Sequence, residues 1–337
     1  MGERQKEKKG ERMEWITRRI DRFWREALSA MAVLLVVPIG YLIFSTYEEN
    51  HIASQALHIK SLSQHVASAL AKDMQVRQLE VRALAELPEI KSGPLNSEKV
   101  QLALIQAQNS YPLYSWIGVA DIKGKVHAAT KGMLLGQSVS SRPWFEQALS
   151  RPYTGDLHEA KLLADLLNAP LADGPLRFID FAAPIRDAQG NTRGVIGAHV
   201  YWRWADNLVG SFLSNSYMRD QIEIWLLNRD NEIIFPNNFR QPFDVKDLAM
   251  IERSPSAQFI RWAGKEPYLS ASTRLQAPGH EISNLGWRVV VTQPKSAVIQ
   301  MVAPVTNTVR FLMFLPILIF VLVVWWLSKQ RTHSSPA

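Results

Sequence analysis

The sequence predicts an α+β fold, in which two modules built on antiparallel sheets lie along a long N-terminal stalk helix, with a membrane-spanning helix on either side of this body. Three observations lead to this prediction. Two uncharged apolar stretches bracket the chain, a long run after the first has helical spacing, and two similar units of strands and turns follow. The expected segments cover residues 1–26, 27–44, 45–95, 96–213, 214–300, 301–327 and 328–337.

Both apolar stretches are long enough to cross a lipid bilayer. A hydrocarbon layer of roughly 30 Å needs about 17 to 25 helical residues, and residues 27–44 and 311–327 contain no charge. The alternative for the first stretch is a cleaved secretory signal. A polar segment of 26 residues precedes it, however, and its end, Tyr41-Leu42-Ile43-Phe44, offers no small-residue cleavage site. We therefore favour an uncleaved anchor.

The distribution of positive charge predicts the orientation in the membrane. Residues 1–26 contain nine Lys or Arg, and Lys329 and Arg331 follow the second stretch. Because cytoplasmic flanks are enriched in Lys and Arg, we expect both termini in the cytoplasm. The central body is then periplasmic, anchored in a bacterial inner membrane by two spans.

The net charge of +7 lies mostly at the ends of the chain. Nine basic and six acidic residues give residues 1–26 a charge of +3, and residues 328–337 add +2. Only +2 remains for the body, which predicts no nucleic-acid binding. The chain has no cysteine, so disulfides and thiolate metal sites are excluded. We expect no cofactor and no enzyme activity, because no nucleophile elbow, paired metal motif or phosphate-binding glycine loop occurs.

A long stalk helix is predicted directly after the first span. From Tyr47 to Leu87 apolar residues recur at helical spacing, and Pro88 ends the run. Unbroken, such a helix is about 60 Å long. A second helix is expected to begin at Asn96 or Ser97, since either side chain can cap the free amides of its first turn.

Two similar units of short strands follow the stalk. Residues 121–124 and 228–231 are predicted turns between strands, and 194–200 and 285–291 are strand-like runs that close each unit. The strands expected around the two turns cover residues 114–120, 125–129, 222–227 and 233–235. We therefore expect a membrane-distal module at 96–213 and a membrane-proximal module at 214–300, joined near residues 214–220.

Five phrases, taken in order, carry a resemblance to a known family. They are Ser-Arg-Pro-Trp-Phe at 141–145, Gly-Asp-Leu-His-Glu-Ala at 155–160, Arg-Phe-Ile-Asp-Phe-Ala-Ala-Pro-Ile at 177–185, Gly-Val-Ile-Gly-Ala-His at 194–199 and Leu-Gly-Trp-Arg-Val-Val at 285–290. In this order they resemble the double Cache sensor family, whose modules are PAS-like. The phrases are most similar to the sensors of membrane diguanylate cyclases and chemoreceptors.

The resemblance implies a ligand site in the distal module. In the family an Arg-x-Trp-aromatic phrase often binds a carboxylate, and Arg142, Trp144 and Phe145 match it. An acidic residue further along binds an ammonium group, and the candidates are Asp156, Glu159 and Asp180. Gln137 stands where amino-acid-binding members place a tyrosine. The expected ligand is therefore a carboxylate, an amine or a related metabolite.

The same residues also have readings that involve no ligand. Pro143 at the first turn of a short helix, after a Ser140 or Ser141 cap, explains the first phrase with Trp144 in the core and Arg142 paired locally. Asp180 could alternate outward to solvent.

A metal site is not expected from the sequence. His158, next to Asp156 and Glu159, lacks the second histidine that a helical zinc motif needs. The sequence therefore assigns no metal ligand.

The leading functional hypothesis is a membrane receptor that binds a small periplasmic ligand and passes a conformational change to a partner, with two chains dimerised along their stalks. Because residues 328–337 are too short to form a domain, we expect the output to belong to another protein. One alternative is the sensory portion of a diguanylate cyclase, hence cyclic di-GMP signalling, or of a chemoreceptor. Another is a membrane adaptor that binds no metabolite.

Overall fold

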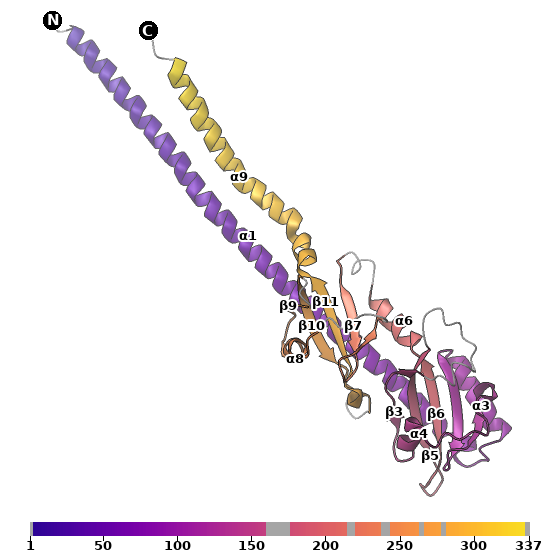
Figure 1. The fold of residues 1–337 in the computed structure, drawn as a ribbon. Helices are drawn as coiled ribbons and strands as arrows, with labels where there is room; N and C mark the ends of the chain where they lie inside the picture. Colours follow the sequence, from indigo (N-terminus) through magenta and orange to yellow (C-terminus); the bar gives the residue numbers. More distant parts are fainter. Residues whose placement is uncertain are drawn as a thin grey trace. The chain divides into compact units, whose positions relative to one another are not determined.

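The computed structural model describes residues 3–159, 176–213, 220–236, 243–262, 266–277 and 281–333 (Figure 1). Contacts within the chain divide it into two units. One unit combines Met1–Gln55 with Ser296–Ala337, and the other is Ala56–Lys295.

The described residues of the first unit belong to two helices, of which the first continues into the second unit. Helix α1 (Glu3–Ala85) is continuous for 83 residues and contains the basic segment, the first apolar stretch and the stalk. Helix α9 (Lys295–His333) contains the second apolar stretch. Among the described residues no single helix meets the length and hydropathy criteria for a membrane span. Two parts of α9, Lys295–Val305 and Asn307–Val323, meet them together as a pair bent by 46°.

The second unit contains the distal sheet, which is antiparallel throughout. Its strand order is β2-β1-β6-β5-β3, and β4 also pairs with β5. The strands are β1 (Tyr114–Asp121), β2 (Val126–Ala129), β3 (Tyr153–Thr154), β4 (His158–Glu159), β5 (Arg177–Arg186) and β6 (Thr192–Tyr201). The three strands predicted here, 114–120, 125–129 and 194–200, are confirmed with ends shifted by one or two residues.

The proximal sheet has the order β8-β7-β11-β10-β9 and is also antiparallel. Its strands are β7 (Glu223–Leu227), β8 (Ile233–Phe235), β9 (Gln258–Arg261), β10 (Pro267–Arg274) and β11 (Arg288–Pro294). The predicted strand 285–291 begins too early. Leu285 ends a 3₁₀ turn, and Gly286 has φ = 69°, a left-handed conformation that extended strand cannot continue through.

Short helices complete the second unit, namely α2 (Pro88–Lys91), α3 (Glu98–Ser110), η1 (Thr130–Gly132), α4 (Pro143–Ala148), α6 (Arg203–Phe212), α8 (Val245–Arg253) and η3 (Glu281–Leu285). Ser97 caps α3 by accepting a hydrogen bond from the Val100 amide, as predicted. The cap expected at Ser140 or Ser141 is wrong, because Arg142 is the N-cap residue of α4 and its side chain makes no capping bond. The predicted join at 214–220 lies outside the described residues, except for Asp220.

The stalk part of α1 packs against both sheets (Figure 1). Its buried face carries Ile59, Leu62, Val66, Leu70, Met74 and Val81, which follow the helical spacing read from the sequence. The Lys60 ammonium donates a 2.7 Å hydrogen bond to the Ser272 carbonyl of β10. The Gln78 amide donates to the Ala182 carbonyl of β5 and accepts from the Thr154 hydroxyl. One helix therefore holds both sheets by apolar packing and by specific polar bonds.

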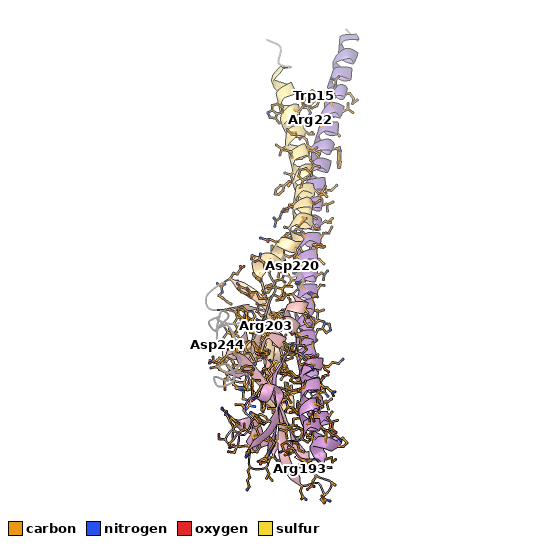
Figure 2. The ribbon with its side chains drawn as sticks, turned by 90° about the vertical axis from the view of Figure 1, so that its right-hand side faces the viewer. Trp15, Arg22, Arg193, Arg203, Asp220 and Asp244 are labelled. Carbon is orange, nitrogen blue, oxygen red and sulfur yellow. The ribbon has the colours of Figure 1, made fainter. Side chains whose placement is uncertain are left out.

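Two polar side chains, Arg193 and Asp244, form hydrogen bonds with main-chain groups in the second unit. The Arg193 guanidinium, labelled in Figure 2, donates to the carbonyls of Lys91 and Gly93 and so ties β6 to the end of the stalk. Asp244, also labelled there, caps α8 by accepting from the Lys246 amide. Both side chains satisfy main-chain groups that regular hydrogen bonding within the elements leaves free.

Candidate ligand-binding site

A cavity of about 630 Å³ opens on one face of the distal sheet. It lies between strands β5 and β6 and the segment that runs from α4 to β4. Its walls are formed by Leu134, Val139, Arg142, Pro143, Trp144, Tyr153, Gly155, Asp156, Leu157, His158, Glu159, Asp180 and His199. Five of the six residues predicted to contact a ligand are among them, and Phe145 is not.

Trp144 and Phe145 leave α4 in different directions. Neighbouring residues on a helix point about 100° apart, and of these two rings Trp144 is the one on the cavity wall. Phe145 is 2% exposed and packs in the distal core, which corrects its predicted place against a ligand. Trp144 is 4% exposed, belongs to the same core and also lines the cavity. Trp144 therefore packs in the core with one part of its surface and lines the cavity with another.

Two glycines make room for the Trp116 and Trp144 rings. Gly118 on β1 and Gly197 on β6 are register partners in adjacent strands. A Cβ at Gly197 would lie 2.5 Å from Cζ3 of Trp144, and a Cβ at Gly118 would lie 2.1 Å from Cζ2 of Trp116. The Trp116 and Trp144 rings, 5.8 Å apart, therefore lie directly on glycine backbone.

Arg142 supplies positive charge at the edge of the cavity. Its side chain is exposed, and Pro143 fixes the backbone directly after it. Within the part of the chain that the structure describes, its guanidinium has no ion-pair partner. A planar fork of donors in this position suits a carboxylate.

Asp180 and His199 form the inner wall. They are register partners on β5 and β6, which places both side chains on the same face of the sheet. Both are buried, and Nδ1 of His199 is hydrogen-bonded to Oδ1 of Asp180. His158 on β4 brings its Nε2 to 3.6 Å from Oδ2 of Asp180. Asp180 therefore faces the cavity and not solvent.

The inner wall is acidic. Burial raises the pKa of Tyr153, and the nearby carboxylates of Asp180 and Asp156 raise it further. Glu159 adds a third carboxylate on the cavity wall. Positive charge at Arg142 and negative charge at these residues give the cavity two poles, an arrangement that suits a zwitterion or a small amine or acid.

Asp156 connects the cavity to the proximal module. Its Oδ1 accepts a 2.7 Å hydrogen bond from the indole Nε1 of Trp287 and another, also 2.7 Å, from the Leu157 amide. Trp287 is fully buried and stands next to Arg288, the first residue of β11. Its ring meets that of Trp202 edge to face at 5.6 Å. Asp156 on the cavity wall is therefore hydrogen-bonded to the residue directly before β11, the strand that leads into α9.

No family model and no curated protein matches the chain. Solved structures do. The sensory domain of the Campylobacter jejuni chemoreceptor Tlp3 with isoleucine bound is 15% identical, with a TM-score of 0.54, over 74% of this chain and 97% of that one. The chain has a double Cache fold.

Two receptor domains from Pseudomonas aeruginosa share this double Cache fold. The PctC domain in complex with GABA is 16% identical with a TM-score of 0.51, over 70% of this chain and 98% of that one. The PctB domain in complex with L-Arg is 15% identical with a TM-score of 0.52, over 72% and 96%. At these identities the likeness establishes the fold, and the chemistry of the site has to be argued from its own residues.

Sequence reasoning missed three residues of this site. His158 was considered only with its sequence neighbours, and His199 was read only as part of a strand phrase. The sequence assigns no metal ligand because a second histidine is missing from the local motif, and the structure brings His199 near His158 from β6 and β4, the two strands that flank β5. Trp287 was read only as part of a closing phrase. Strand register and module contacts, which bring these residues in, have no local signal in the sequence.

Proposed function

We propose that this chain is an inner-membrane receptor whose double Cache body lies in the periplasm and binds a small carboxylate- or amine-containing molecule in the distal cavity. The observation that carries the proposal is the cavity itself. Five residues chosen from sequence phrases line one cavity, with three carboxylates around its wall and a guanidinium that has no ion-pair partner among the described residues.

The ligand is oriented by opposite charges. Arg142 binds its carboxylate through the guanidinium fork, as a charge-assisted pair. Oδ2 of Asp180 and Nε2 of His158, 3.6 Å apart, accept hydrogen bonds from its ammonium group. Trp144 covers the apolar part and excludes water. The isoleucine, GABA and L-Arg complexes of the similar domains support a ligand of this size and charge.

The two apolar stretches cross the membrane in this proposal. Residues 27–44 and 311–327 are uncharged, and their large apolar side chains are exposed in the chain by itself, with Leu34 at 72% and Phe311 at 66%. Lipid is the solvent that such surfaces require. The Arg310 guanidinium lies 5.2 Å from the centre of the Phe44 ring. This cation–π contact joins the C-terminal end of the first stretch to the N-terminal end of the second.

Ligand binding shifts an equilibrium between two states of the body. The stalk helix continues into the first span, and β11 leads through Lys295 into α9 and the second span. A ligand that binds one state more tightly biases both connections and passes the bias to a partner inside the cell. Two chains dimerise along their stalks, where exposed Leu57 and Leu79 offer apolar contacts.

A thermal-shift screen of the full chain in detergent tests the ligand site. Amino acids, amines and small carboxylates are the candidates. At one hundred times Kd a ligand adds about 2.7 kcal/mol of stability, which raises Tm by roughly 5 to 10 °C. Arg142→Ala removes this shift for carboxylate ligands, and Arg142→Lys restores only part of it. Lys123→Ala, an exposed change outside the cavity lining, leaves the shift unchanged.

Two results would overturn the proposal. One is a stabilising ligand whose shift survives both Arg142→Ala and Asp180→Asn. The other is a reporter fused within residues 96–213 that is active only in the cytoplasm. If no small molecule shifts Tm, the adaptor hypothesis gains instead.

A further inference from the structure

His158, Asp180 and His199 meet on the inner wall of the cavity, each from a different strand of the distal sheet. One ligand-type atom from each residue lies within 4.8 Å of the other two. Asp180 and His199 are buried, whereas the His158 side chain is 39% exposed. Imidazole nitrogen and carboxylate oxygen are the donors that zinc and its first-row neighbours bind.

The main chain fixes the tautomer of His158. Its Nδ1 lies 3.2 Å from the carbonyl oxygen of Asp156. A carbonyl oxygen only accepts hydrogen bonds, so Nδ1 carries a proton, and Nε2 of the neutral ring presents a lone pair. That lone pair is 3.6 Å from Oδ2 of Asp180, which is also an acceptor. Two acceptors held this close favour a proton or a metal ion between them.

His199 is fixed in a similar way. Its Nδ1 donates to Oδ1 of Asp180, and its ring stacks on Trp116 with centroids 5.0 Å apart and planes at 29°. A metal ion bound by this group takes the place of the Nδ1 proton, because a nitrogen ligand has to be deprotonated. Histidines that bind metals are typically held at the other nitrogen by a carboxylate or a backbone carbonyl. His158 has the Asp156 carbonyl in this position.

We propose that His158, Asp180 and His199 form a binding site for a divalent transition-metal ion, with zinc as the reference ion. Two ligand atoms on tetrahedral zinc with bonds of 2.0–2.1 Å are roughly 3.3 Å apart, close to the observed 3.6 Å. Calcium and magnesium prefer shells of oxygen atoms, which two imidazoles do not provide. Three protein ligands leave a coordination position open toward the cavity, where a water molecule or a ligand carboxylate completes the sphere.

This site goes beyond the receptor proposal and does not depend on it. The metal ion uses the Asp180 oxygen assigned above to a ligand ammonium, so the two compete. Arg142 belongs only to the organic ligand. The two proposals therefore respond differently to the same variants, and either one can fail while the other stands.

Calorimetric titration of zinc into the full chain, purified in detergent and in a buffer free of chelators, tests the site. We expect one ion per chain with an affinity that falls at least about tenfold in His158→Ala and in Asp180→Asn. His158→Ala removes a partly exposed side chain and leaves the buried core in place, and Asp180→Asn preserves side-chain shape. Cobalt(II) gives a second readout, since its visible absorption bands report nitrogen and oxygen ligands in a tetrahedral field and vanish in both variants.

His127 provides the matched control. It pairs with Asp121 at 2.8 Å, but within the described residues this pair belongs to no group of three ligands. His127→Ala and Arg142→Ala are expected to leave zinc affinity within about twofold of the unmodified chain. Zinc binding that is equally strong in His158→Ala overturns the proposal, as does a loss of affinity in His127→Ala as large as that in His158→Ala.

Discussion

Replacing Trp287 with phenylalanine tests whether the cavity is mechanically linked to the proximal module. The change removes the indole donor, and with it the 2.7 Å hydrogen bond to Oδ1 of Asp156, while a buried aromatic ring remains. A hydrogen bond to a charged group contributes about 1.5–3 kcal/mol. Asp156 is exposed and regains water when the bond is lost, so we expect the lower end, about 1.5 kcal/mol.

Hydrogen–deuterium exchange measures this loss where it occurs. The Leu157 amide donates to the same Asp156 oxygen, and the Gly155 amide donates to the Asp180 carbonyl at 2.8 Å, so both report opening of the cavity segment. A loss of 1.5 kcal/mol raises a local opening constant about tenfold. We therefore expect amides of residues 153–159 to exchange roughly ten times faster in Trp287→Phe.

Trp262→Phe is the matched control. Trp262 is buried, and its indole donates at 2.9 Å to the Ser270 hydroxyl inside the proximal module. This variant loses the same donor and the same ring volume without touching the distal module. If both variants change exchange at 153–159 equally, or if neither does, the bond to Asp156 does not hold the cavity segment, and the proposed linkage is refuted.

Three further variants test other parts of the fold. Gly197→Ala places a Cβ 2.5 Å from the Trp144 ring, so overpacking costs about 1–3 kcal/mol, visible as a lower Tm, while Gly210→Ala, with open space around it, keeps or raises Tm. Burial raises the pKa of Tyr111 to about 12, so the folded state favours the protonated phenol. The stability that this preference contributes is fully present below about pH 10 and is lost as the pH rises through 12. Tyr111→Phe should remove that alkaline loss, about 1 kcal/mol after allowing for solvent screening at this half-exposed ring, in melting curves from pH 9 to 12. Ser97→Ala removes the cap of α3 and should cost about 1 kcal/mol in the same assay, without altering ligand binding.

Local patterns predicted the stalk, the Ser97 cap of α3 and most strands. Of the apolar residues at helical spacing, Ile59, Leu62, Val66 and Leu70 are buried, whereas Val76 and Leu79 are exposed. The helix ends at Ala85, before Pro88. Such features depend on neighbours within a few residues, which the sequence displays directly. The strand expected from Leu285 failed for a local reason too, since a left-handed Gly286 interrupts the backbone there.

The site was predictable only in part. Arg142, Trp144 and the three carboxylates, which family phrases mark, line the cavity. Phe145, marked by the same phrase, packs in the core, because a phrase does not say which way each ring points from a helix. The facing of Asp180 and His199 follows from the register of β5 on β6. The bond between Asp156 and Trp287 joins residues 131 positions apart. Neither contact can be predicted from residue spacing in the sequence, because each depends on how the folded strands and modules pack against one another.

The contacts at Asp156 limit how a ligand can signal. A ligand that draws the Asp156 carboxylate toward itself has to offset the bond to Trp287, worth about 1.5–3 kcal/mol, and so shifts an equilibrium by roughly 10- to 150-fold. Moving a population from 1:99 to 99:1 requires about 10⁴-fold, or 5.5 kcal/mol. A second link between modules is therefore needed, and the Arg177 guanidinium, which donates at 3.2 Å to the Ile234 carbonyl and lies 5.5 Å from the centre of the Trp202 ring, is placed to supply it. Burial lowers the pKa of Arg177, so docking of the modules imposes a desolvation cost on this guanidinium, which the nearby carboxylates of Asp206 and Glu159 offset in part.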